Sequence, residues 1–406
     1  MDGVLGEVMR TFPNSLRLKG ARVALNATKS ETADLLVHRG RIVPTESGEN
    51  PALTMDLSGH LILPGLINAH DHLEFSLFPR LGNGPYPNAS AWAADIYRPL
   101  EEPIKEHLRV PKSARLLWGG LKNLLSGVTT VSHHNPCEAE LFGNGFPVRV
   151  VKQFGWAHSF DFSPDLVERY RKTPPRWPFI VHAGEGTDSR ARSEIYRLDQ
   201  AGVLGHRTVL VHAVALDGPG CDLIRTRRAS IVWCPSSNRF TVGQTLKLNF
   251  LGSGVPIALG SDSSLTSMGD LIDEIAIARR SSGLGTDALY EMVTRQAARI
   301  LRLRNGEGGI RTGGVADLLI VRDRGQCPAD SLLRLRPELV LARGVIQLIS
   351  PRLARQLPAS LRSSLHPIEL GYRGRWLVNV DVRKLYDETT AILGGEIRLG
   401  GKRVQA

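Results

Sequence analysis

The pattern of apolar and polar positions divides the chain into three parts. In the first 60 residues, short runs alternate apolar with polar positions and are separated by turn residues, which is typical of strands in a small antiparallel sheet. These runs are "SLRLKGARVAL", "ADLLVHRGRIV" and "TMDLSGHLIL". A similar pattern returns after residue 310, in "GGIRTGGVADLLIVRD" and "PELVLARGVIQLI". We therefore expect strand-rich segments at both ends of the chain.

The middle of the chain has a different pattern. Short apolar runs alternate there with helix-like segments. The apolar runs are "SGVTTVSHH", "PFIVHAGEG", "RTVLVHAVAL", "ASIVWCPSSN" and "GVPIALGSDSS". Strands that alternate with helices indicate a parallel α/β sheet or barrel.

One apolar run ends in two histidines. In "HLILPGLINAHDHLEF", residues 60–75, the run 61–67 is predicted to be a buried strand with a kink at its Pro-Gly pair. Residues i and i+2 of an extended chain point to the same face, so His70 and His72 project together. Two neutral imidazoles placed in this way can bind one metal ion. An isolated pair of this kind is equally consistent with polar residues that leave a strand for solvent.

Polar residues follow each of the other apolar runs at once. They are His133 and His134, then His182 and Glu185, then His212, then Cys234 with Asn238, and finally Asp262. Active sites of (β/α)8 barrels lie at the carboxyl ends of the parallel strands. Six such endings in order, with the histidine pair, favour a barrel active site.

Four of these residues have the chemistry of a metal site. His70, His72, His182 and Asp262 offer three imidazoles and one carboxylate. A catalytic zinc-type site needs three or four such ligands and an open position for water, and this mixture suits Zn(II) or Fe(II) better than Ca(II) or Mg(II). Taken alone, His182 is better interpreted as a core histidine and Asp262 as a helix N-cap. Taken together, the four predict one divalent metal.

The motifs resemble a known family. "LPGLINAHDH", "VHAGEG", "LVHAVALD", "WCPSSN" and "LGSDSS", in this order, are similar to the amidohydrolase superfamily, and most similar to its branch of cytosine, guanine, S-adenosylhomocysteine and triazine deaminases and chlorohydrolases. The resemblance covers roughly residues 16–345. It implies an α/β fold, a (β/α)8 TIM-like barrel with a small composite β-sandwich domain built from both chain ends. The expected division is 1–60 and 311–406 for the sandwich, the latter including a tail, and 61–310 for the hydrolase barrel.

The resemblance also implies a role for each site residue. The metal ligands would be His70, His72, His182 and Asp262. Asp262 would also take the proton of the attacking water, which His212 orients, and Glu185 would carry protons to a ring nitrogen of the substrate. His158 and His134 are assigned to substrate binding.

Two features depart from the family pattern. The interval from His134 to Phe179 is about 45 residues, whereas one βαβ unit alone needs about 30, so we expect a barrel that is pruned around strands 3 and 4. Lys152 lies in this interval. In binuclear relatives a carboxylated strand-4 lysine bridges two metals, but the glutamate of the HxxE motif and the location of Lys152 favour a single metal here.

Residues 73–110 form a long insertion after the first barrel strand. Its Gly, Pro and aromatic content predicts an ordered loop over the site. A surface loop or a dimer contact is the alternative. The tail after residue 350 is expected to add strands such as "GRWLVNV" and "GGEIRLGGKRV".

Composition and charge limit the class of partner. The net charge is +11, but no block of Lys and Arg is interleaved with aromatic residues and no nucleic-acid motif is present. No run of about 18 apolar residues and no secretory signal is found, and the four cysteines form no CxxC pair. We expect a cytoplasmic protein with a small-molecule substrate and neither a nucleic-acid nor a membrane partner, and homodimer formation stays open.

The leading functional hypothesis is a metal-dependent hydrolase that deaminates an amino-substituted heterocycle. The same site could instead hydrolyse a cyclic amide or another C–N or C–halogen bond. A cytidine-deaminase type of site needs H-x-E followed by P-C-x-x-C, and it is rejected because "NPCEAE" lacks the second cysteine. A non-catalytic relic used for binding is the remaining alternative.

Overall fold

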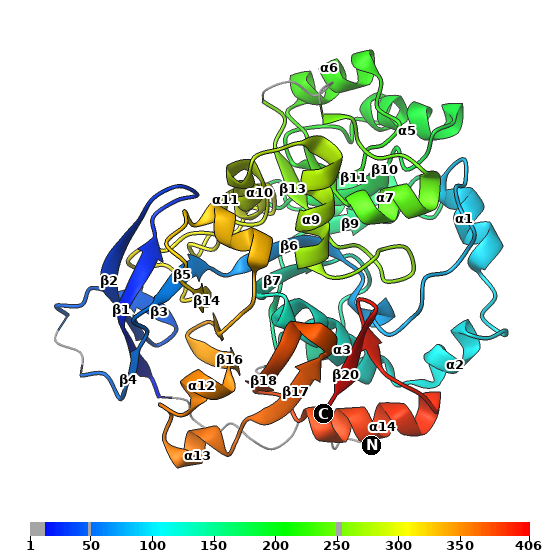
Figure 1. Ribbon diagram of the computed structural model, residues 1–406. Coiled ribbons are helices and arrows are strands. Elements are labelled where there is room, and N and C mark those ends of the chain that lie inside the picture. Colours follow the sequence, from blue (N-terminus) through cyan, green and yellow to red (C-terminus); the bar gives the residue numbers. More distant parts are fainter. Residues whose placement is uncertain (1–12, 48–49, 144, 249–253) are drawn as a thin grey trace.

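The computed structural model describes residues 13–47, 50–143, 145–248 and 254–406. Strands from the two ends of the chain form one large sheet, and parallel strands with their helices form the rest (Figure 1). Within the described residues, no helix is both long enough and apolar enough to cross a membrane.

The large sheet has twelve strands. The first part of the chain contributes β1 Ser15–Ala24, β2 Ser30–His38, β3 Arg41–Val43, β4 Leu53–Asp56 and β5 His60–Pro64. The last part contributes β14 Leu318–Arg322, β15 Leu339–Ala342, β16 Val345–Ile349, β17 His366–Leu370, β18 Gly374–Val378, β19 Arg398–Leu399 and β20 Lys402–Gln405. The two parts join where β5 pairs antiparallel with β14. The sheet is mixed rather than purely antiparallel, because β4 and β5 run parallel to β1.

Eight parallel strands form two sheets, and the predicted site residues lie at or just after the carboxyl ends of six of them. A three-stranded sheet contains β6 Leu66–Asp71, β7 Val128–His133 and β8 Arg149–Val150. A five-stranded sheet contains β9 Gly155–Ala157, β10 Phe179–Ala183, β11 Thr208–His212, β12 Ser230–Trp233 and β13 Ile257–Leu259. The Asp262 N–H donates to the carbonyl of His70 at 3.0 Å, which joins the end of the second sheet to the first. Apolar side chains of both sheets share one buried cluster, as in a TIM-like arrangement.

Helices connect most of these parallel strands. They are α3 Lys112–Leu125, α4 Leu166–Lys172, α5 Ser189–Gln200, α6 Gly218–Arg227, α7 Pro235–Val242, α9 Leu271–Ser282, α10 Thr286–Met292 and α11 Arg295–Ile300. Only residues 151–154 join β8 to β9, so that connection has no helix. The chain is therefore shortened where the sequence predicts it, at the third and fourth parallel strands.

Gly65 separates the large sheet from the parallel strands. The sequence suggests one kinked strand over 61–67, but the structure has two strands, β5 and β6, in different sheets. A Cβ atom at Gly65 would lie 2.3 Å from the side chain of Thr129, so only glycine fits at this crossing. The close approach lets β6 begin beside β7 and run up to the two histidines.

The insertion and the tail both have regular structure. The insertion contains a short 3-10 helix η1 Leu73–Phe75 and helices α1 Ala89–Ile96 and α2 Ile104–Arg109. The tail adds α12 Pro351–Ala354, α13 Ala359–Arg362, α14 Val382–Leu393 and the expected strands, and the remaining 3-10 turns are η2 Ala139–Phe142, η3 Ala329–Arg334 and η4 Gly371–Arg373. The Trp118 indole N–H donates to the Thr389 hydroxyl at 2.9 Å, which ties α14 to α3.

Candidate metal centre and active site

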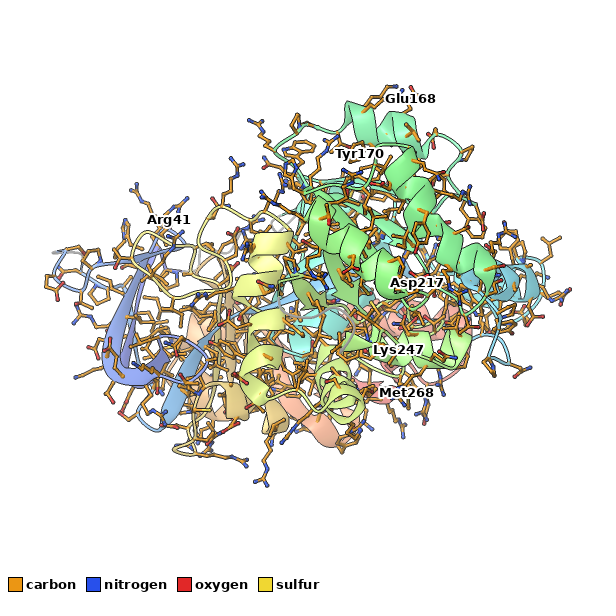
Figure 2. The ribbon with its side chains drawn as sticks, turned by 90° about the horizontal axis from the view of Figure 1, so that it is seen from above. Arg41, Glu168, Tyr170, Asp217, Lys247 and Met268 are labelled. Carbon is orange, nitrogen blue, oxygen red and sulfur yellow. The ribbon has the colours of Figure 1, made fainter. Side chains whose placement is uncertain are left out.

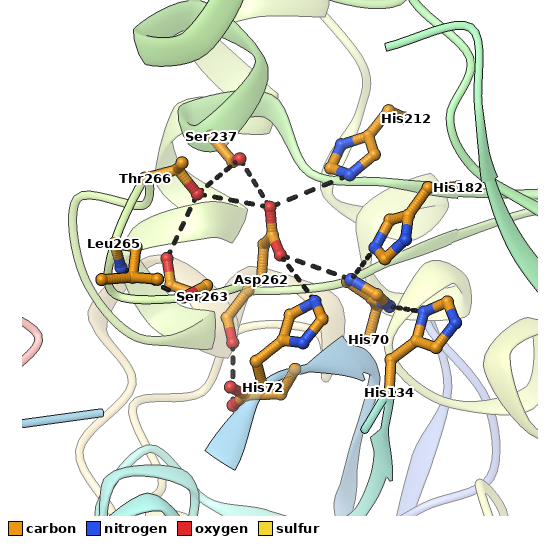
Figure 3. A network of polar contacts seen from close by, with 12 residues as sticks. His70, His72, His134, His182, His212, Ser237, Asp262, Ser263, Leu265 and Thr266 are labelled. Carbon is orange, nitrogen blue, oxygen red and sulfur yellow. Dashed lines mark hydrogen bonds and ion pairs between the residues drawn. The ribbon is translucent and has the colours of Figure 1, made fainter. Parts of the chain in front are cut away.

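Side chains from three parallel strands converge at one point (Figure 3). His70 Nε2 lies 3.2 Å from His182 Nε2 and 3.3 Å from Asp262 Oδ1. His72 Nε2 lies 3.6 Å from the same Asp262 oxygen. Neighbouring ligands of a tetrahedral zinc ion are about 3.3 Å apart when the bonds have normal length. The spacing of the four predicted ligands therefore fits one such ion.

Hydrogen bonds on the far side of each ring decide which nitrogen faces the centre. His72 Nδ1 lies 2.8 Å from Asn135 Oδ1, and His182 Nδ1 lies 2.9 Å from the His158 carbonyl. Each Nδ1 must donate to these acceptors, so each Nε2 keeps its lone pair. The lone pair of His182 Nε2 points toward His70 Nε2, 3.2 Å away, where a metal ion would lie between the two rings.

Burial keeps the His70 and His182 imidazoles neutral, which is the form that binds metals. Desolvation lowers the pKa of His70 to about 4 and the pKa of His182 well below its usual value. Burial alone would raise the pKa of Asp262, but its hydrogen bond with His70 and the histidines around it hold that pKa well below the usual range. The centre thus offers neutral nitrogens and one anionic oxygen.

The second oxygen of Asp262 is also held. Ser237 Oγ donates to Asp262 Oδ2 at 2.5 Å, and Thr266 Oγ1 approaches the same oxygen at 3.4 Å. The backbone of Asp262 is left-handed, with φ of 57°, and that of His212 has φ of 76°. Non-glycine residues rarely take this conformation and cluster at functional sites when they do. The helix N-cap role considered for Asp262 belongs instead to Asp270, which caps α9.

Glu185 and His212 lie beside this centre. Glu185 Oε2 is 3.4 Å from His212 Nε2, and His212 Nδ1 is 2.7 Å from Asn238 Oδ1. Asn238 Nδ2 donates to Thr245 Oγ1 at 3.3 Å, which fixes its oxygen toward His212. His212 Nδ1 is therefore the donor, and its Nε2 offers a lone pair.

A proton on Glu185 makes this pair attractive. Burial raises the pKa of Glu185 well above its usual value, and the charges of Asp262 and Glu194 raise it further. Burial also lowers the pKa of His212. Both shifts favour the neutral pair, in which a protonated Glu185 would be the donor toward His212.

A pocket opens on the other side of Glu185. It is lined by residues from α1, the loop after β9, the end of β10 and α5, among them Ser90, His158, Phe162, Arg190 and Glu194. The His158 ring lies against the rings of His182 and Phe162, at 4.6 and 4.9 Å between centroids. Its Nδ1 is buried without a hydrogen-bond partner. Burial raises the pKa of Glu194 to about 7, although its carboxylate accepts the Gly184 N–H.

A second hollow lies next to this pocket. Thr187, Arg192 and Gln244 line it together with Asp217 and Lys247. Figure 2 shows Asp217 and Lys247 close together, far from Arg41 on the large sheet. The loops that follow β10, β11 and α7 therefore shape the surface beside the site.

The insertion packs directly on the catalytic loops. The Ala89 N–H donates to the Glu185 carbonyl at 2.9 Å, and Ser90 Oγ donates to Asp161 at 2.5 Å. A Cβ atom at Gly186 would lie 2.7 Å from the Pro87 carbonyl, so this contact requires glycine. The N-terminal end of α1 thus forms one wall of the pocket.

Two residues considered from the sequence do not face the pocket. Lys152 is exposed, and its ammonium lies 4.4 Å from the centre of the Phe142 ring, whereas the predicted metal ligands are buried. It cannot bridge two metals in this position. His134, predicted to bind substrate, has no exposed surface, and protein atoms approach both of its ring nitrogens. It does not line the pocket.

Sequence reasoning missed a polar network beneath the ligands. Asp71, between the two histidines, is fully buried and accepts from Lys122 at 3.1 Å, Asn123 at 2.8 Å and Ser261 at 3.1 Å. Asn68 links to it by bonding Ser261, next to Asp262. The sequence could have indicated this network, because an aspartate next to an apolar run is expected to be buried and a buried aspartate needs a partner. The sequence did not indicate that the partner would come from α3.

Comparisons with known proteins give a family match and several relatives. Residues 179–344 match the amidohydrolase family. A 5-methylthioadenosine/S-adenosylhomocysteine deaminase of Syntrophobacter fumaroxidans is 26% identical over 335 residues, which are 66% of this chain and 73% of that protein. A 5'-deoxyadenosine deaminase of Methanothrix thermoacetophila is 23% identical over 362 residues, 76% of this chain and 85% of the relative. The relatives and the family match thus place the similarity of this chain with amidohydrolases.

Solved structures support the same fold. A zinc-bound adenosine deaminase of Xanthomonas campestris superimposes with a TM-score of 0.66 at 18% identity, over 93% of this chain and 97% of that chain. A zinc complex of atrazine chlorohydrolase from Arthrobacter aurescens gives a TM-score of 0.66 at 17% identity, over 93% and 100%. The resemblance of the sequence motifs to the deaminase and chlorohydrolase branch of this superfamily is confirmed.

Proposed function

We propose that this protein is a metal-dependent hydrolase of the amidohydrolase superfamily and that it removes an amino group from a nitrogen heterocycle. The observation that carries the proposal is the convergence of His70, His72 and His182 with Asp262, beside Glu185, whose pKa burial raises. Deamination of a ring needs an activated water on one side and a proton for a ring nitrogen on the other. The centre and Glu185 supply these two requirements next to the same pocket.

The donor set fits one Zn(II) or Fe(II) ion. His70, His72, His182 and Asp262 would hold it, and it would lower the pKa of water toward neutrality when bound. Asp262 Oδ1 faces the histidines, so it is placed to accept the proton of the water. The bonds from Ser237 and Thr266 hold the other oxygen and keep the carboxylate oriented.

Glu185 acts as the acid, and His212 lies beside it and contacts the attacking water. The proton on Glu185 is available because burial and nearby negative charge disfavour the carboxylate. Transfer of this proton to a ring nitrogen makes the ring carbon more electrophilic. Once Glu185 has given its proton to the ring, His212, held by Asn238, can accept a hydrogen bond from the water at Nε2.

The pocket suggests an aromatic ring as the reacting part of the substrate. His158 and Phe162 present ring surfaces, and the buried Nδ1 of His158 lacks a partner that a substrate N–H could supply. The relatives named above act, by their names, on adenosine derivatives. An adenine-type nucleoside is therefore the first substrate class to test.

Several structural expectations belong to the same proposal. We infer that the two parallel sheets form one barrel, pruned at β8 and β9, and that 1–60 and 311–406 form one composite domain. The insertion 73–110 would cover the pocket as a lid. A cytoplasmic location is consistent with four free cysteines, and homodimer formation remains a proposal.

The test is an ammonia-release screen. Purified protein with one equivalent of Zn(II) or Fe(II) is incubated with adenosine derivatives, guanine, cytosine and aminotriazines, and ammonia is measured. We expect ammonia from at least one aminated heterocycle and none from the Glu185→Gln variant. Release of halide or opening of a cyclic amide, without ammonia, would replace the proposed reaction. Absence of every such activity in a metal-loaded protein would favour the binding relic.

A further inference from the structure

His134 is enclosed between the metal ligands and the fourth parallel strand. Its side chain is fully buried. Its ring stacks on the His182 ring at 4.4 Å between centroids and meets the Trp156 ring edge-on at 5.3 Å. This packing leaves no path from the pocket to the His134 ring atoms, although the residue lies within the histidine cluster.

The two nitrogens of His134 connect a backbone carbonyl to a metal ligand. Nε2 lies 3.1 Å from the Ala157 carbonyl, and Nδ1 lies 3.3 Å from His70 Nδ1 (Figure 3). The carbonyl can only accept, so Nε2 of a neutral His134 carries the hydrogen and Nδ1 is an acceptor. His70 Nδ1 must then donate to it. This leaves the lone pair of His70 on Nε2, which faces His182 and Asp262.

The shortened strand explains why a side chain makes this connection. β8 pairs with β7 only at Arg149 and Val150, below the level at which β7 ends. His134 follows β7, donates its backbone N–H to the Asp71 carbonyl at 3.0 Å, and reaches the Ala157 carbonyl at the end of β9. The imidazole thus connects β7 to β9 beyond the carboxyl end of β8, where the shortened strand no longer separates them.

We propose that His134 is the residue that positions His70 for metal binding, and that it does not bind substrate. The other two imidazole ligands are oriented by oxygen acceptors, Asn135 for His72 and the His158 carbonyl for His182. For His70 the acceptor is the His134 ring, itself oriented by the backbone of the pruned region. This inference rests on the proposed metal-dependent function, but it concerns metal affinity rather than the reaction.

The test compares zinc affinity and substrate affinity in three variants. His134→Leu removes both polar atoms, His134→Asn keeps an acceptor near the Nδ1 position, and His134→Gln keeps a donor near the Nε2 position. Zinc dissociation constants are measured by competition with a chromogenic chelator, and kcat and KM are measured at saturating zinc. His158→Asn is the control, because a pocket residue should change KM and leave zinc affinity near that of the unchanged protein.

We expect His134→Leu to weaken zinc binding about 10- to 100-fold, the usual effect of removing an outer-shell partner, with KM unchanged at saturating zinc. His134→Asn should bind zinc at least roughly tenfold more tightly than His134→Gln, and this pair decides the question if the leucine variant does not fold. Equal zinc affinity in the asparagine and glutamine variants, or an unchanged zinc affinity with a raised KM, would overturn the inference. If the unchanged protein binds zinc but releases no ammonia, the proposed reaction fails and this inference stands.

Discussion

Glu185 Oε2 lies 3.4 Å from His212 Nε2, while the opposite nitrogen of His212 is held by Asn238 at 2.7 Å. A neutral imidazole with its Nδ1 hydrogen on an acceptor can only accept at Nε2. The raised pKa of Glu185 and the lowered pKa of His212 then favour the carboxyl group as the donor between the two residues. This arrangement stores a proton beside the metal ligands, and the next two predictions follow from it.

Replacing Glu185 with glutamine should separate metal binding from turnover. The amide has the shape of the carboxyl group but cannot transfer a proton, so kcat should fall by about 10²- to 10⁴-fold. Metal content should stay at that of the unchanged protein, because Glu185 is not among the predicted ligands. Both quantities are measured on the same preparation. Normal turnover in this variant would remove the acid role from Glu185.

Asn238→Leu should lower kcat without loss of metal. The change removes the acceptor of the His212 Nδ1 hydrogen, so the ring is free to rotate or to place its hydrogen on Nε2. We expect a decrease of roughly tenfold or more. Thr245→Val is the matched control, because it removes the hydroxyl behind Asn238 and leaves His212 its partner. A loss as large in the control would show that general packing, not the His212 contact, is responsible.

Breaking the Lys122–Asp71 pair should strongly destabilise the fold. The ammonium and the carboxylate are 3.1 Å apart, and both side chains are almost completely buried. Lys122→Met leaves a buried carboxylate without its counter-charge, which costs about 3–5 kcal/mol. Lys112→Met is the control, since Lys112 pairs with Glu138 at 2.7 Å on a partly exposed surface and should contribute no more than about 1 kcal/mol. Urea unfolding of both variants measures the difference.

Glu274 should make stability depend on pH above the acid range. It is buried in α9 against Ser236 of α7, and burial raises its pKa to about 8. The folded protein then holds a proton that the unfolded chain releases above about pH 5. The free energy of unfolding should therefore decrease as pH rises from about 5 to about 8, by on the order of 1 kcal/mol per pH unit at most.

The Glu274→Gln variant tests this contribution directly. Its amide can replace the protonated carboxyl group against Ser236 but does not titrate. Chemical unfolding at a series of pH values should give a flatter dependence between about pH 5 and about pH 8 than in the unchanged protein. Parallel curves for the two proteins would mean that Glu274 is ionised in the folded state.

The sequence indicated the parts of the site that lie at strand ends. A strand's carboxyl end can be located from an apolar run, and successive parallel strands bring such ends to one edge. His70, His182 and Asp262 were therefore predictable, although they are far apart along the chain. The sequence predicted a kink near Gly65 but not the division into two strands. One apolar run contributes to two sheets, and its periodicity does not show which strands each half pairs with.

Partners that depend on packing could not be predicted in this way. Lys122 lies 51 positions from Asp71 on a helix whose rotation is fixed only when it packs. The role of His134 depends on where the shortened β8 ends relative to β7, and the pattern of apolar and polar residues does not indicate that position. Ser90 lines the pocket because of the way the insertion folds. The sequence before α1 has no periodic pattern from which that fold could be predicted.

The most direct test of the account is the metal content of the protein purified without added metal or chelator. Elemental analysis should find about one Zn or Fe per chain in the unchanged protein and about none in His182→Ala, whose kcat should be lost together with the metal. His206→Ala, a change at an exposed histidine, should keep both. No metal in the unchanged protein, even after reconstitution, would contradict the metal-dependent mechanism. A full metal complement in His182→Ala would remove that histidine from the ligands.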